Sequence, residues 1–339
     1  MKPKQIALLL GILLVLLLLT LLLEGPLKGR KVPEPKRLFS EFDPSLVEVI
    51  EILQNDKMAR LEREGDRWVV LEVDTLESAE SADKKDALRH FADTSAVKRV
   101  LNSIDSLSGD LISNNPENES LFQVTSEEGI MVKAFGKGDS LLAHFYIGKI
   151  GQDFSSTYIR RDGSNEVILA RGFYRGSTFH PDVKRWRNRN ILSFLPFNLN
   201  RLEITSSEEN LLLQKDEEGE WTILEPLEAK TDSFKVDQLL RSLSNLNSQD
   251  FGDRATPEET GFDTPTLQIS MEFLDQPSRI LTIGILKEES QYYVQASGDE
   301  TIYLVNKFTI KQFQKKPEDL KAKVEEKEGE KGEEEEKEG

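Results

Sequence analysis

The sequence has 339 residues, of which 37% are hydrophobic and 31% charged, and a formal net charge of −17. This excess of acidic residues argues against a general nucleic-acid-binding protein, because neutralising phosphates requires a surplus of Lys and Arg. The chain contains no cysteine. Disulfides, zinc–thiolate sites, a cysteine nucleophile and a lipid-modified cysteine are therefore excluded.

The first element in chain order is an apolar run from Ile6 to Leu23, interrupted only by Gly11 and Thr20. As a helix it would span roughly 27 Å, enough to cross the hydrocarbon core of a bilayer. A cleaved signal peptide has a shorter apolar region followed by small residues. We therefore expect residues 1–24 to be an uncleaved transmembrane anchor, with the lipid bilayer as a partner. The basic residues that follow the run would, by a literal charge count, keep the soluble part in the cytoplasm.

The soluble part is expected to have five segments. Residues 25–37 combine prolines with charges and read as an extended linker. Two domains follow, at 38–171 and 191–316, joined by a basic connection at 172–190. The acidic tail, 317–339, becomes almost exclusively Lys, Glu and Gly, and we expect it to be disordered because it has little apolar surface to bury.

The two domains are predicted to be copies of one unit, because matched residues keep a constant offset within elements and change it only at loops. Trp68 matches Trp221, Gly148 matches Gly284, and the stretch that starts at Asp93 matches the one that starts at Asp232. Gly148 and Gly284 are interpreted as strand-end or close-approach positions. The two tryptophans are interpreted as core anchors.

Each copy combines two periodicities. Asp93 and Asp232 are capping residues ahead of an apolar pattern at i, i+3, i+4 and i+7, which predicts one amphipathic helix per copy. Turn residues before each tryptophan predict a hairpin. Short alternating runs predict further strands at 130–135, 142–147, 158–160 and 167–170, and at 267–273, 280–285, 292–295 and 302–305. The expected fold class is α+β, with antiparallel strands and one main helix in each domain.

The second copy carries a family resemblance. Its stretches Glu220-Trp221-Thr222-Ile223-Leu224-Glu225-Pro226, Leu281-Thr282-Ile283-Gly284 and Ile302-Tyr303-Leu304-Val305 follow one another in the order seen in the bacterial family called domain of unknown function number 4340. The first copy matches more loosely. The resemblance implies a membrane-anchored envelope protein with no agreed catalytic residues. Some relatives are similar to auxiliary subunits of gliding-motility-type ABC transporters, which implies a soluble part outside the cytoplasmic membrane.

A search for reactive groups predicts no catalytic, cofactor-binding or metal-binding residues. The histidines, His90, His144 and His180, are scattered without metal-ligand spacing. The carboxylate pairs are interpreted as solvated surface; they are Glu208-Glu209, Glu217-Glu218 and Glu258-Glu259. The glycine-containing stretches 136–138 and 171–176 lack phosphate-loop spacing, and we expect them to be turns.

A basic cluster stands out against the acidic background, at Lys184-Arg185-Trp186-Arg187-Asn188-Arg189. In one interpretation it contacts anionic lipid headgroups, an envelope polyanion or an acidic protein. In the favoured interpretation Arg187 and Arg189 pair with acidic groups of the two domains, and Trp186 is buried between them.

Two functions follow as hypotheses. The first is a non-enzymatic, single-pass inner-membrane protein whose extracytoplasmic domains act as a scaffold or binding module, in an envelope complex of the ABC-transporter type. The second is an envelope hydrolase that uses carboxylates in a cleft between the two copies. The missing catalytic pattern favours the first.

Overall fold

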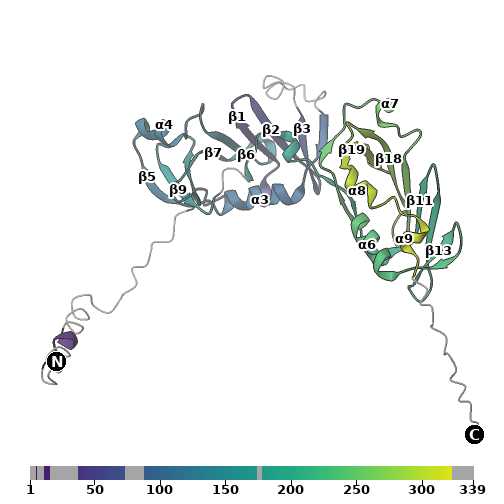
Figure 1. The fold of residues 1–339 in the computed structure, drawn as a ribbon. Coiled ribbons are helices and arrows are strands. Elements are labelled where there is room, and N and C mark those ends of the chain that lie inside the picture. The colour runs from purple at the N-terminus through teal and green to yellow at the C-terminus, as the bar shows by residue number, and fades with distance from the viewer. Residues whose placement is uncertain (1–4, 6–10, 16–36, 73–87, 174–177, 323–339) are drawn as a thin grey trace, which may run out of the picture. The chain divides into compact units, whose positions relative to one another are not determined.

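The computed structural model describes residues 5, 11–15, 37–72, 88–173 and 178–322. The chain divides into two compact units, with the division between Arg187 and Asn188. Each unit is a large antiparallel sheet with a helix on one face, and the units are described separately (Figure 1).

The first unit is built on a nine-stranded sheet with the order β4-β3-β2-β1-β6-β7-β8-β9-β5. All its neighbouring strands pair antiparallel. Its strands are β1 (Val49–Gln54), β2 (Lys57–Glu64), β3 (Arg67–Glu72), β4 (Leu88–Phe91), β5 (Asp110–Ser113), β6 (Ile130–Phe135), β7 (Leu141–Ile150), β8 (Ser156–Arg161) and β9 (Val167–Arg171).

The second unit repeats this sheet with the order β14-β13-β12-β11-β17-β18-β19-β20-β16. Its strands are β11 (Leu199–Ser206), β12 (Asn210–Lys215), β13 (Trp221–Glu225), β14 (Ala229–Lys230), β16 (Asp250–Phe251), β17 (Leu267–Phe273), β18 (Arg279–Lys287), β19 (Gln291–Ala296) and β20 (Tyr303–Asn306). A separate two-stranded ladder joins β10 (Asn190–Ser193) to β15 (Asn245–Asn247). The matching order of the two sheets confirms two related α+β domains.

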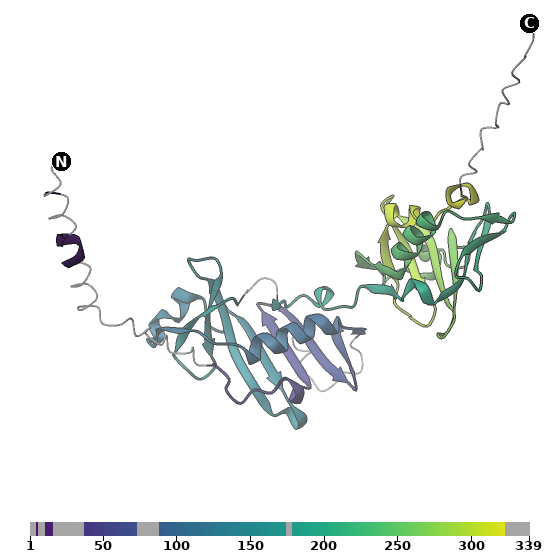
Figure 2. The same ribbon diagram turned by 90° about the horizontal axis from the view of Figure 1, so that it is seen from below.

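One long helix covers the same face of each sheet, α3 (Thr94–Asp105) in the first unit and α6 (Ser233–Ser244) in the second. The Asp93 carboxylate accepts hydrogen bonds from the amides of Ser95 and Ala96, and Asp232 caps α6 in the same way. Four residues at helical spacing are buried in each helix; they are Val97, Val100, Leu101 and Ile104 in α3, and Val236, Leu239, Leu240 and Leu243 in α6. Figure 2 shows α3 lying across the strands of its sheet. Both predicted helices and their caps are confirmed.

A closing segment completes each core. In the first unit it includes η5 (Val183–Arg185), and the amide of Asp93 donates to the carbonyl of Trp186 over 2.7 Å. In the second unit it comprises α8 (Lys307–Lys311) and α9 (Pro317–Leu320), and the amide of Asp232 donates to the carbonyl of Leu320 over 2.8 Å. The buried side chains of these segments belong to the two cores; they are Phe173, Phe179 and Trp186, and Ile310, Phe313 and Leu320.

The two domains therefore extend past their expected ends at 171 and 316. Most of the expected connection, 172–190, packs on the first unit, and residues 317–322 of the expected tail form α9 and a bridge between Thr231 and Lys321. The rest of the tail, 323–339, lies outside the described residues.

Each of the two matched tryptophans, Trp68 and Trp221, carries a cation over its ring. Arg63 lies 5.1 Å from the Trp68 ring centroid and donates to the carbonyl of Ser45, in the turn η1 (Pro44–Leu46). Lys215 lies 5.6 Å from the Trp221 ring and donates to the carbonyl of Phe197 over 3.0 Å. Trp68 is buried and Trp221 is partly buried against the core, which confirms them as core anchors. In each unit a 3-10 turn precedes the first strand of the sheet, η1 in the first unit and η6 (Pro196–Asn198) in the second. The cation's contact with the ring and its hydrogen bond to the carbonyl hold this turn against the hairpin that carries the tryptophan.

The matched glycines are close-approach positions, as predicted. A short helix rests on the opposite face of each sheet, α4 (Glu119–Phe122) in the first unit and α7 (Pro257–Thr260) in the second. A Cβ on Gly148 would lie 2.2 Å from the carbonyl oxygen of Phe122, and one on Gly284 would lie 1.8 Å from that of Thr260. Only glycine allows the helix end to approach this closely.

Among the described residues, no helix is long and apolar enough to cross a membrane. Most of the apolar run from Ile6 to Leu23 and nearly all of the linker at 25–37 lie outside the described residues.

We predict that Gly148→Ala and Gly284→Ala each lower the free energy of unfolding of their own unit by about 1–3 kcal/mol, because the added methyl group has no space. Urea unfolding measures the loss. Gly163→Asn is a suitable control: this turn position has φ 69° and open space around it, and Asn tolerates that conformation. A loss at Gly148 no larger than the loss in the control would contradict the prediction.

Candidate functional site

The face of the first sheet that lies away from α3 carries a row of ionisable side chains. Strand alternation places them there: Ile50 and Ile52 of β1 point into the core, so Glu51 points to the opposite, outer face. Cross-strand pairing aligns one position from each strand, in the order Arg89, Leu71, Arg60, Glu51, Lys133 and His144. Asp162 follows, because its amide donates to the carbonyl of His144 over 3.0 Å. We call these seven residues the outer row.

The first half of the outer row is an ionic network. Arg60 is only 8% exposed, and its guanidinium bonds Glu51 and, over 2.8 Å, Glu62. Arg89 then bonds Glu62 over 3.0 Å and Glu64 over 2.5 Å. A buried guanidinium requires such partners, because an unpaired charge away from water is costly. The network fixes these side chains in one arrangement across β1, β2 and β4.

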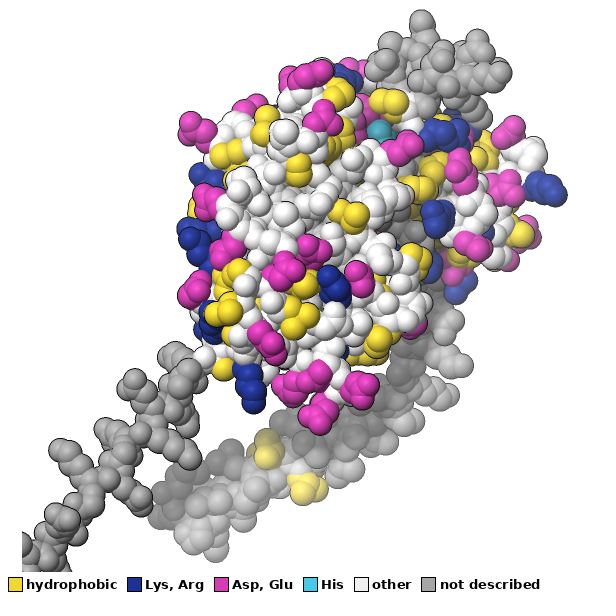
Figure 3. All heavy atoms as spheres, turned by 90° about the vertical axis from the view of Figure 1, so that its right-hand side faces the viewer, with side chains coloured by type: hydrophobic (Ala, Val, Ile, Leu, Met, Phe, Trp, Pro, Cys, Tyr) yellow, Lys and Arg dark blue, Asp and Glu magenta, His cyan; other side chains and the backbone are white. Residues whose placement is uncertain are grey.

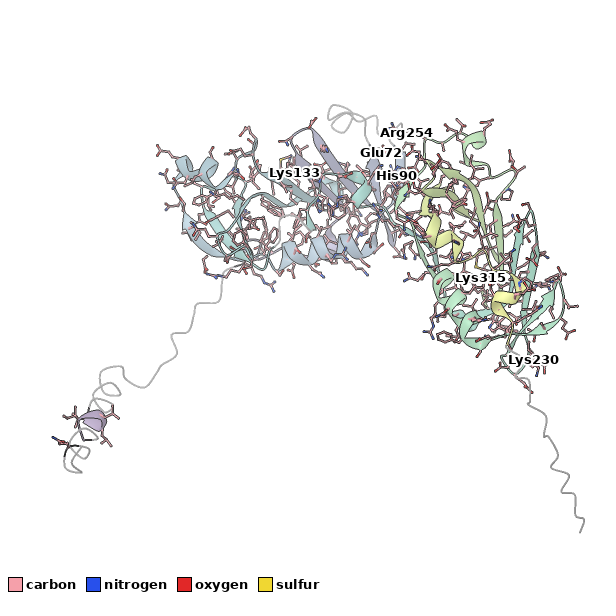
Figure 4. The ribbon with its side chains drawn as sticks, viewed as in Figure 1. Glu72, His90, Lys133, Lys230, Arg254 and Lys315 are labelled. Atoms are coloured by element: carbon pink, nitrogen blue, oxygen red, sulfur yellow. The ribbon has the colours of Figure 1, made fainter. Side chains whose placement is uncertain are left out.

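Lys133 follows Glu51 in the outer row and lies on β6, the central strand of the sheet (Figure 4). Its register partners are Glu51 on β1 and His144 on β7. Among the described residues Lys133 takes part in no salt bridge, although it is only partly exposed. Its ammonium group is therefore available to an anionic group presented to this face.

His144, Asp162 and Tyr146 form the other end of the row. Nδ1 of His144 lies 3.1 Å from one carboxylate oxygen of Asp162, and the Tyr146 hydroxyl donates to the other over 3.0 Å. Nε2 of His144 is buried and has no hydrogen-bond partner among the described residues. Burial lowers the pKa of His144, and the positive charges of Lys133 and Arg160 lower it further, against the opposing effect of Asp162. Burial and the bond to Asp162 raise the pKa of Tyr146.

Arg160 links this end of the row to the short helix on the same face. Its guanidinium lies 4.7 Å from the Tyr146 ring, donates to the carbonyl of Val124 over 3.0 Å and lies 3.2 Å from Glu119 of α4. These contacts join the Tyr146 ring, the Arg160 guanidinium and α4. Because Tyr146 donates to Asp162, which in turn contacts His144, the same contacts help to position that pair.

The second unit provides an internal comparison, because its strands have the same order. Equivalent register positions there hold mostly uncharged side chains: Leu212, Ser270 and Ile280 stand where the first unit has Arg60, Lys133 and His144. Glu203 retains the acid of Glu51 but is bonded by Asn210 over 3.2 Å. The scaffold is duplicated and the charge pattern is not.

The structure keeps the three histidines apart. His90 on β4 lies 3.1 Å from Glu72, and the carbonyl of His180 accepts from the Trp186 indole over 2.7 Å. Figure 4 labels His90 and Glu72. The described residues contain no group of three or more acidic or histidine side chains placed to hold a metal ion.

The carboxylate pairs and glycine stretches occupy connections. Glu208 and Glu209 lie between β11 and β12, and Glu217 and Glu218 between β12 and β13. Glu258 and Glu259 lie in α7, where Glu259 completes a capping box. Residues 136–138 lie in the connection from β6 to β7; residues 174–176 of the second glycine stretch lie outside the described residues.

The basic cluster divides between the two units. Trp186 and Arg187 are buried in the first unit, at 2% and 3% exposure. Arg189 belongs to the second unit, where it donates to the carbonyl of Gln249 and lies 5.7 Å from the Phe251 ring. The pairing of Arg187 and Arg189 with acidic groups of the two domains stays a prediction.

The family model described as "Domain of unknown function (DUF4340)" matches residues 85–265, more than half of the chain. The chain belongs to this family. The DUF4340 match begins just before β4 and ends just before β17, so it takes in parts of both units. No curated protein matches the sequence.

Among solved structures, the chain matches the crystal structure of a DNA polymerase sliding clamp from Pseudomonas aeruginosa with ligand. The match has 9% identity and a TM-score of 0.15, and covers 79% of this chain and 60% of that chain. A TM-score this low carries no conclusion about fold or function.

We predict that His144 makes the stability of the first unit sensitive to acid. Its pKa is lowered in the fold, so between that value and the ordinary value of about 6.5 the unfolded chain binds more protons than the folded chain. Stability is therefore lost as the pH falls below about 6.5, and His144→Ile, which introduces the residue of the second unit, removes this part of the loss.

The measurement is urea unfolding of both proteins between pH 7.5 and 5. The difference between them isolates His144, because the carboxylates and the other histidines are common to both. An identical pH dependence in the two proteins would contradict the prediction.

Proposed function

We propose that this DUF4340 protein is a membrane-tethered, non-enzymatic binding module of the bacterial cell envelope. The observation that carries the proposal is the restriction of the outer row to one of two copies of the same sheet. Residues shared by both copies, such as the caps, tryptophans and glycines, build the fold. A feature that only one copy has is not needed for the shared fold, so it can serve to recognise a partner.

The arrangement of the outer row supports a binding surface. Its charged groups are held by cross-strand bonds on a rigid sheet, so little conformational entropy is lost when a partner contacts them. Lys133 supplies a cation between Glu51 and His144 that forms no salt bridge within the described part of the chain. From Arg60 through Glu51 and Lys133 to Asp162 the charges alternate in sign, which favours a partner with the complementary alternation and disfavours other partners.

The membrane part of the proposal is supported by the sequence. The apolar run from Ile6 to Leu23 is long enough to cross a bilayer, and the proline-containing linker at 25–37 would separate it from the first unit. The resemblance described above favours an inner-membrane protein with its units outside the cytoplasm. The proposed role beside an ABC-type transporter rests on this resemblance alone.

We predict that a photo-crosslinking amino acid at position 133 captures a membrane or envelope protein in native cells, whereas the same group at position 98 does not. Lys98 is an exposed residue of α3 in the same unit, so it controls for expression, tethering and random collision. Mass spectrometry of the crosslinked products in detergent extracts makes the comparison. Equal products from both positions, or none from position 133, would contradict the proposed binding surface.

A further inference from the structure

Exposed hydrophobic side chains gather at one corner of the first unit, where the edge strand β5 meets the turn between β7 and β8. Phe154 in this turn is 85% exposed, and Leu111, Ile112 and Ile150 beside it are each about half exposed. On the face that Figure 3 shows, hydrophobic side chains lie in small groups among charged ones, which is usual for a protein surface. A cluster of large exposed hydrophobic residues instead marks an interaction site. We call these four residues the apolar corner.

Three interactions join the parts of the apolar corner. Asp110, the first residue of β5, lies 3.2 Å from Arg171 at the end of β9. The residue that follows Arg171 donates its amide to the carbonyl of Ser155 in the β7–β8 turn over 2.9 Å. A bridge between Arg37 and Ser108 places the entry of the chain into this domain directly before β5. Figure 1 shows β5 and β9 together at one end of the first unit.

The fold of the β7–β8 turn does not require Phe154. Its backbone has φ 57°, a left-handed conformation that is unfavourable for a bulky side chain. The turn is held instead by the Asp153 carboxylate, which accepts from the amides of Ser155 and Ser156 over 3.1 and 2.9 Å. A phenylalanine at this position, with its ring in solvent, therefore points to a role outside the fold.

The matching corner of the second unit is acidic at its tip. The turn between β18 and β19 carries Glu288 and Glu289, and Leu286 before it is less exposed than Ile150. Its edge strand β16 begins with an aspartate, as β5 does, but the next residue, Phe251, is buried and a glycine follows. The complete apolar corner belongs only to the unit that follows the expected anchor.

The bilayer lies within reach of the apolar corner. Residues 24–36 separate the end of the apolar run at Leu23 from Arg37, so they span at most about 45 Å. Arg37 is itself held next to β5. We propose that the apolar corner inserts into the surface of the lipid bilayer in which the chain is anchored. This inference rests on the anchor of the proposed function and adds a second contact with lipid.

The driving force for this contact is hydrophobic. Charged groups of both signs flank the apolar corner: Arg171 pairs with Asp110, and Lys149 and Asp153 lie on either side of Ile150. With no excess of either sign, attraction to anionic headgroups is small. The anchor holds the corner near the membrane at a high effective concentration, so a small apolar surface suffices. We therefore expect contact with zwitterionic lipid that persists at about 1 M salt.

The absence of cysteine allows a single introduced cysteine to be labelled. The test places an environment-sensitive fluorophore at Gln152→Cys, beside the apolar corner, in the full-length protein reconstituted in phosphatidylcholine vesicles. Lipids brominated in the upper part of the acyl chain quench a fluorophore only on contact, so a protein partner or a second copy cannot imitate the signal. Ser290→Cys, exposed in the matching turn of the second unit, is the control, and Val15→Cys reports on the anchor.

We expect brominated lipid to reduce the emission at position 152 about twofold, as for a group about 5–10 Å deep in the interface, and to leave position 290 unchanged. Adding Leu111→Thr, Ile112→Thr and Phe154→Asn to the labelled protein should abolish the quenching at position 152. Thr suits an edge strand and Asn suits the left-handed turn, so thermal unfolding should be preserved.

The proposal is overturned if position 152 is not quenched, if position 290 is quenched equally, or if quenching survives the triple replacement. Quenching that requires phosphatidylglycerol and disappears at about 1 M salt would also overturn it, because the contact would then be electrostatic. The label at position 15 separates this result from a failure of the proposed function. If position 15 is quenched and position 152 is not, the anchor stands and the corner contact falls; without quenching at position 15, the membrane anchor itself is contradicted.

Discussion

The backbone bond between the helix cap and the closing segment is the constraint on which each unit depends. Asp93 uses its carboxylate to start α3 and its amide to hold Trp186; Asp232 does the same for α6 and Leu320. One residue thereby positions the helix on the sheet and fastens the last segment over the remaining core. The helix-side core is closed only when the closing segment reaches the helix cap at this point.

Sequence reasoning identified the parts whose signal is local. The caps, the amphipathic helices, the hairpins before Trp68 and Trp221 and the alternating strands all carry their pattern within about a dozen residues. Gly148 and Gly284 were recognisable because the duplication pairs them. The closing segments were missed because Phe179 and Trp186 sit in a polar, basic stretch whose burial depends on contacts with distant β-strands and with α3. The edge strands β4, β5, β14 and β16 are short and have little pattern of their own.

The outer row was missed for a different reason. Each of its residues, taken alone, is a polar residue on the solvent side of an alternating strand, and such residues are normally solvated. The row exists only once β1, β2, β6 and β7 are in register, which places Arg60, Glu51, Lys133 and His144 side by side. A comparison of the two copies position by position could have revealed the row, because the uncharged Ser270 and Ile280 stand in the second unit where the first has Lys133 and His144.

Duplication thus separates the shared scaffold from a charge pattern that only one copy carries. Both units preserve the groups that close a nine-stranded sheet under one helix, and they differ in the surfaces that face outward. The first unit has a fixed row of charges on its sheet, whereas the second has mostly uncharged side chains at the equivalent positions.

The most direct test of this account replaces outer-row residues of the first unit, and Glu62 beside them, by their counterparts in the second. The variant carries Arg60→Leu, Glu62→Gln, Lys133→Ser, His144→Ile and Asp162→Ser. To these is added Met58→Asn, which gives Glu51 the hydrogen-bond partner that Asn210 gives Glu203, so that no buried charge is left unpaired and stability is nearly unchanged. The account predicts that thermal unfolding is preserved while co-purification of the envelope partner in detergent is lost. Co-purification undiminished by the exchange would contradict it, because the outer row would then be part of the scaffold and not the binding surface.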